Sequence, residues 1–135
     1  MEQIKVWVAS LASFIVLDFI YFSAFASKFT QKQLGPLLKL DAEGKMQFNY
    51  FAGLLVYALM AFAIVLFVLP KTNGLSPIKS GLWAAALGII MFGLYELTNF
   101  SFIKGWSLPY VFTDIVWGAV AFFLTTLIVK MVFKI

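Results

Sequence analysis

Three carboxylates inside otherwise apolar runs are the residues of this sequence that could do chemistry. Asp18, Glu96 and Asp114 each interrupt a stretch that is long and hydrophobic enough to cross a membrane. An ionisable side chain is costly in the hydrocarbon region, so it marks a candidate functional site. Such a group can carry a proton, coordinate a cation, or donate a hydrogen bond when it is neutral.

The richest of these stretches is Leu-Tyr-Glu-Leu-Thr-Asn-Phe at residues 94–100, followed by Lys-Gly-Trp at 104–106. Glu96 and Asn99 are three residues apart and therefore share one face of a helix, which makes Asn99 the expected partner of Glu96. No lysine or arginine lies at the depth of the three carboxylates. At least one carboxyl group, Glu96 first, is therefore expected to be protonated near neutral pH.

The composition indicates an integral membrane protein. Hydrophobic residues make up 63% of the 135 residues and charged residues 12%, against about 45–50% and about 25% in soluble domains. The chain has no Cys and no His, so we expect no metal and no cofactor. The net charge of +4 comes from lysines near the ends of the apolar runs, which favours contact with lipid headgroups and not with nucleic acid.

Four apolar runs predict an all-α, polytopic membrane protein, a four-helix bundle with short loops in a single domain over residues 1–135. The expected spans are residues 4–26, 48–69, 78–102 and 110–129. The first run lacks the cleavage site of a signal peptide, so we expect it to be retained.

The first connection, residues 28–47, carries four lysines and is expected to be a loop. Its residues 34–38 could lie in the membrane interface or in solvent. Residues 71–77 and 104–109 are expected to be tight turns. Four spans place both ends of the sequence on one side of the membrane. The lysines divide equally between the two sides, and we lean only weakly towards cytoplasmic termini.

Counting helical rise at about 1.5 Å per residue places all three carboxylates in the leaflet next to the first and third connections. Polar and aromatic residues share that half, while the opposite half is almost entirely aliphatic and Phe. This asymmetry predicts a one-sided ligand pocket. Its expected lining is Asp18, Tyr21, Asn49, Tyr50, Tyr95, Glu96, Asn99, Trp106, Asp114 and Trp117. The alternative for each carboxylate is a structural hydrogen bond between helices, worth about 0.6–2 kcal/mol.

Small residues gather at the start of the third run, where Gly81, Ala84, Ala85 and Gly88 follow one another at short spacing. Small residues let two helix backbones approach closely. The pattern favours packing against another helix of the same chain, and the alternative is a homo-oligomer face.

The sequence resembles the domain-of-unknown-function 2177 family of small integral membrane proteins. The motifs that carry the resemblance are Leu-Asp at 17–18 with Tyr21, Gln-Leu-Gly at 33–35, Tyr-Glu-Leu-Thr-Asn at 95–99, Lys-Gly-Trp at 104–106 and Asp-Ile-Val-Trp-Gly at 114–118. The family usually has Asp at the position of Glu96, which reaches one methylene further. The resemblance implies four transmembrane helices and supplies no catalytic residue.

Three functions remain open at this point. The first is binding or transport of a small amphipathic molecule, a proton or a cation in the acidic pocket. The second is a membrane enzyme acting on a lipid, with the carboxylates as acid and base. The third is an accessory subunit of a membrane complex. The expected partners are the lipid bilayer and an amphipathic ligand, and the sequence does not decide whether the protein is an enzyme.

Overall fold

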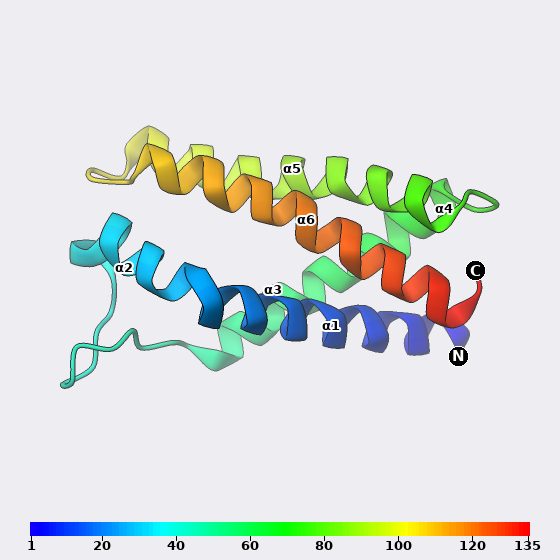
Figure 1. The fold of residues 1–135 in the computed structure, drawn as a ribbon, viewed down its shortest axis with the longest axis horizontal. Helices are drawn as coiled ribbons and strands as arrows, with labels where there is room; N and C mark the ends of the chain where they lie inside the picture. The colour runs from blue at the N-terminus through cyan, green and yellow to red at the C-terminus, as the bar shows by residue number, and fades with distance from the viewer.

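The computed structural model describes residues 1–135 as an all-helical molecule (Figure 1). Four of its helices are long and apolar enough to cross a membrane: Glu2–Leu37, Tyr50–Lys71, Pro77–Phe102 and Leu108–Phe133. The predicted fold class, a bundle of four transmembrane helices, is therefore confirmed.

The first helix is longer than the sequence predicts. It consists of α1 (Glu2–Tyr21), a π-helical turn η1 (Phe22–Ala26), α2 (Ser27–Leu34) and a 3-10 turn η2 (Gly35–Leu37). The expected loop from residue 28 is thus wrong for its first part. The polar residues there form an amphipathic extension of the helix, because charged side chains do not end a helix and the first breaker is Gly35 with Pro36.

The second helix comprises α3 (Tyr50–Ala63), the π-helical turn η3 (Ile64–Val68) and α4 (Leu69–Lys71), and it is followed by α5 (Pro77–Phe102) and α6 (Leu108–Phe133). Three polar side chains start these helices by accepting hydrogen bonds from free backbone N–H groups. Asn49 caps α3, Ser76 caps α5 and Ser107 caps α6. Pro77 and Pro109 lie in the first turns of α5 and α6, where proline is tolerated.

Helices α5 and α6 lie side by side along their length, while α3 runs obliquely to the others (Figure 1). Their close approach depends on glycine: a methyl group at Gly88 would lie 2.4 Å from the backbone oxygen of Gly118. Gly81 and Ala84 are buried as well. Most of the small-residue face is therefore used within the chain, and the homo-oligomer through this face stays an untested prediction.

The apolar core lies in the middle of the bundle. Phe14 of α1, Ile64 of η3, Ala84 of α5 and Phe122 of α6 are buried there, and the Phe14 and Phe122 rings meet edge-on with centroids 4.9 Å apart. The first and last residues lie at one end of the bundle, and the connections 38–49 and 103–107 lie at the other (Figure 1). We call the second of these the acidic end, after Asp18, Glu96 and Asp114, and the first the lysine end, after Lys130.

Candidate functional site: carboxylates and grooves at the acidic end

Asp18 of α1 forms hydrogen bonds with side chains of two other helices, α3 and α6, at the acidic end. Its Oδ2 accepts a hydrogen bond from the hydroxyl of Tyr57 on α3. Its Oδ1 accepts one from the indole Nε1 of Trp117 on α6, at 2.9 Å. Both donors are neutral. Asp18 also forms no ion pair: the two ion pairs of the chain are Lys5–Glu2 and Lys45–Glu43. The carboxyl group is thus positioned by hydrogen bonds and left without a cation.

Glu96 is fully buried on α5. Its Oε2 accepts a hydrogen bond from the indole Nε1 of Trp106, at 2.8 Å, and its Oε1 has no hydrogen-bond partner. The carboxyl group of Asp114 on α6 lies near that of Glu96. The site therefore places two acidic side chains together on facing turns of α5 and α6, with one buried oxygen of Glu96 left without a hydrogen-bond partner.

The contacts of the predicted residues fall into two clusters on neighbouring turns of α6, and the single pocket lined by all three carboxylates stays a prediction. Asp114 belongs to the Glu96 cluster and Trp117, three residues later, belongs to the Asp18 cluster. The expected pairing of Glu96 with Asn99 is wrong. Asn99 lies beside the phenol of Tyr95, one turn earlier on α5, because the neighbours of Glu96 come from α6 and from the connection before it.

A groove of about 500 Å³ separates α1 from α3 next to Asp18. On α1 its lining follows the spacing i, i+3, i+4 and i+7, and on α3 the same spacing recurs, so two facing helical stripes form its walls. We call it the α1–α3 groove. Its lining is Ile15, Asp18, Phe19, Phe22, Phe48, Asn49, Tyr50, Gly53, Leu54 and Tyr57. Asp18 is the one ionisable carboxyl group in a largely apolar wall.

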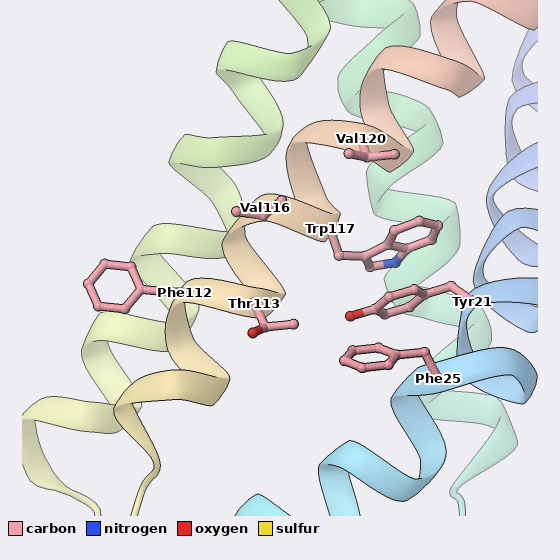
Figure 2. A pocket seen from close by; sticks show the side chains of 7 residues that line it. All are labelled: Tyr21, Phe25, Phe112, Thr113, Val116, Trp117 and Val120. Atoms are coloured by element: carbon pink, nitrogen blue, oxygen red, sulfur yellow. The ribbon is translucent and has the colours of Figure 1, made fainter.

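A second groove, of about 330 Å³, lies on the other side of α1, against α6 (Figure 2). Figure 2 shows the rings of Trp117, Tyr21 and Phe25 arranged one above another in the space between the two helices. The Tyr21 and Trp117 rings are stacked, with centroids 4.0 Å apart and planes within 9°. No charged side chain lines this α1–α6 groove, so it differs from the α1–α3 groove in having no carboxylate of its own.

The remaining predicted residues lie around these clusters. Asn49 and Tyr50 belong to the wall of the α1–α3 groove, where Tyr50 is 82% exposed. Tyr95 meets the ring of Trp106 edge-on at 6.4 Å. No three acidic side chains gather into one cluster.

Sequence reasoning missed most of the α1–α3 groove lining, and the most consequential omission is Tyr57. The hydroxyl of Tyr57 is a direct partner of Asp18. The signal that could have found it is its place in the stripe 50, 53, 54 and 57, which combines two tyrosines with a glycine on one helix face.

The family comparison agrees with this architecture. Residues 3–131 match the model of the family described as "Predicted membrane protein (DUF2177)". The chain belongs to this family. No curated protein and no solved structure matches the chain. Membership confirms the family resemblance and the integral, multi-pass membrane character, while the chemistry of the site must be argued from its own residues.

Proposed function

We propose that the protein binds an amphipathic amine in the α1–α3 groove, with the amine on the carboxylate of Asp18 and the hydrocarbon tail along the apolar wall. The observation that carries the proposal is the position of this carboxylate, in the wall of a groove of about 500 Å³ and without a cation of its own. Grooves of this size with few convergent polar groups suit small ligands.

The chemistry of the polar group follows from the partners of Asp18. Tyr57 and Trp117 each donate one hydrogen bond and supply no positive charge. Each carboxylate oxygen has a further lone pair, so a ligand that brings both N–H donors and a positive charge complements the site. An alcohol brings a donor without the charge, and a fatty acid brings a second negative charge, which Asp18 disfavours.

The apolar part of the ligand is matched by the aromatic and aliphatic wall. Phe19, Phe22 and Leu54 line the groove, and Phe19 and Leu54 are exposed on the outside of the bundle. When the ligand comes from solution, binding of its tail there is favoured by about 25 cal/mol for each Å² of apolar surface removed from water. A ligand that enters from the bilayer gains chiefly from the Asp18 contact, because lipid tails are as apolar as the groove.

The test is saturable binding of radiolabelled dodecylamine to the protein in lipid nanodiscs, with empty nanodiscs as the background. Unlabelled dodecylamine should compete, while dodecanol and dodecanoate should compete at least about tenfold less well. Asp18→Asn should weaken amine binding about 10- to 100-fold, the worth of one charge-assisted hydrogen bond of about 1.5–3 kcal/mol.

A steric pair of variants separates the groove from general membrane binding. Gly53 faces open space, since a Cβ there meets nothing within 4 Å, so Gly53→Leu should fill the groove and block amine binding without disturbing the fold. Ala52→Leu adds comparable bulk on a neighbouring exposed position outside the groove lining and should leave binding unchanged. Equal binding by Gly53→Leu and the unmodified protein would overturn the proposal.

Proton carriage is a second candidate, favoured by the contact between the carboxyl groups of Glu96 and Asp114. Infrared spectroscopy should detect the C=O stretch of a protonated carboxyl group that disappears in Glu96→Gln. A spectrum without such a band would remove this candidate. The acid–base enzyme is supported less, because Glu96 is fully buried and its neighbour is the other carboxyl group.

A further inference from the structure

A lysine is buried at the end of the bundle opposite to the carboxylates. Lys130, in the last turns of α6, is 3% exposed. Its Nζ donates hydrogen bonds to the backbone oxygens of Thr72, at 3.2 Å, and Leu75, at 3.0 Å. It has no carboxylate partner, because the two ion pairs of the chain involve other lysines. An ammonium group has three N–H donors, so one donor remains without a partner, and no acidic side chain neutralises the ammonium group.

The same lysine lines a cavity of about 250 Å³ between the first turns of α1, the α4 region and the end of α6. The lining combines polar and apolar side chains. The polar ones are Glu2, Gln3, Asn73 and Lys130, and the apolar ones are Val6, Val65, Leu69, Pro70 and Ile135. The one acidic residue, Glu2, lies 3.9 Å from Lys5 and is largely exposed. Lys130 is therefore the buried charged residue of this lining, and Glu2 is the exposed one.

We propose that this cavity binds the phosphodiester of an anionic phospholipid, with Lys130 as its charge partner and the amides of Gln3 and Asn73 as further donors. A buried cation without a counter-charge is costly in a membrane protein, and an anionic headgroup at the membrane interface supplies that charge. Val6, Val65 and Leu69 give the cavity an apolar wall against which the start of an acyl chain lies, so a lipid fits better than a free phosphate ion.

The experiment is native mass spectrometry of the delipidated protein with four probes: phosphatidylglycerol, phosphatidylcholine and diacylglycerol of equal chain length, and soluble glycerol phosphate. Phosphatidylglycerol should bind at least about tenfold more tightly than diacylglycerol and glycerol phosphate, and more tightly than zwitterionic phosphatidylcholine. If diacylglycerol binds as tightly as phosphatidylglycerol, the phosphodiester does not contribute to binding and the proposal is wrong. Equal binding of glycerol phosphate would identify a free anion, and not a lipid, as the ligand.

Two matched lysines of α6 test the residue itself. Lys130→Met should reduce phosphatidylglycerol binding at least about tenfold, whereas Lys134→Met removes the same charge from an exposed position at the same end and should have little effect. If Lys130→Met does not fold, Asn73→Leu keeps the lysine and its two hydrogen bonds and should still lower the affinity several-fold. Unchanged binding in the folded Lys130→Met protein, or in Asn73→Leu where that variant must serve, would overturn the proposal.

Discussion

The two ends of the bundle hold ionisable groups of opposite kinds, acidic at one end and basic at the other, and no contact within the chain pairs them. At the acidic end, Asp18 and Glu96 accept hydrogen bonds from neutral phenol and indole groups. At the lysine end, Lys130 donates to backbone oxygens. The two ion pairs that do form, Lys5–Glu2 and Lys45–Glu43, lie on exposed side chains.

The comparison concerns how ionisable groups are accommodated inside a membrane bundle when they form no ion pair. Removing one member of a buried ion pair is strongly destabilising, and pairing is the usual way to place ionisable groups in a membrane. Here the groups are kept apart by the length of the bundle, so no side chain of opposite charge within the chain pairs with either of them. The acidic end adds two grooves open to the lipid side, and the lysine end adds one cavity at the interface.

The largest effect of breaking the acidic end should come from Glu96→Ala, at about 3 kcal/mol in the free energy of unfolding. The substitution leaves a cavity, and the Nε1–H of Trp106 loses its acceptor. Glu96→Gln keeps an acceptor for Trp106 and gives Asp114 a donor, so its cost should stay below about 0.5 kcal/mol. Unfolding by titration with sodium dodecyl sulfate in mixed micelles measures both. If Glu96→Gln destabilises the protein as much as Glu96→Ala, the carboxyl group must be charged, and the expectation of a protonated Glu96 is wrong.

Substitution at the lysine end should lower the free energy of unfolding somewhat less. Lys130→Met should cost about 2 kcal/mol, because the backbone oxygens of Thr72 and Leu75 lose a charged donor while the methionine keeps most of the packing. Lys134→Met is the control and should lie within about 0.5 kcal/mol of the unmodified protein. The same unfolding titration compares them. Equal stability of the two variants would show that the buried lysine contributes nothing to the link between α4 and α5.

The smallest effect should come from Trp117→Phe, which keeps a ring on Tyr21 and removes only the N–H that Asp18 accepts. The expected cost is about 1 kcal/mol. Trp83→Phe is a matched control, since Trp83 is half exposed at the lysine end and lies under Lys71, 5.1 Å from its ring centroid. A Trp117→Phe protein as stable as the control would place Asp18 outside the network that joins α1 to α6.

The fold could be predicted from the sequence because hydropathy alone locates four spans. The extension through α2 was missed, because the lysines at 28 and 32 resemble a solvated loop although nothing before Gly35 breaks the helix. The depth of the carboxylates followed from counting residues along each helix. The hydrogen-bond partners of the carboxylates could not be predicted in this way, because a helix that is apolar on every side has no apolar stripe that shows which face points inwards.

Lys130 illustrates the same limit at the other end. A lysine near the end of a hydrophobic helix usually extends to the lipid headgroups, and the sequence gives no reason to treat Lys130 and Lys134 differently. The rotation of α6 against the link after α4 decides which of them is buried, and this rotation depends on the contact of Gly88 with Gly118 and of Gly81 with Phe123.

The measurement that tests the central claim most directly is photo-crosslinking with dodecylamine that carries a diazirine in its tail, followed by peptide mapping. The account predicts labels concentrated on residues 15–22 and 48–57, the two walls of the α1–α3 groove, and loss of these labels in Gly53→Leu but not in Ala52→Leu. Labels spread evenly over the lipid-facing residues, or concentrated on Phe112 and Val116 of the α1–α6 groove, would contradict it.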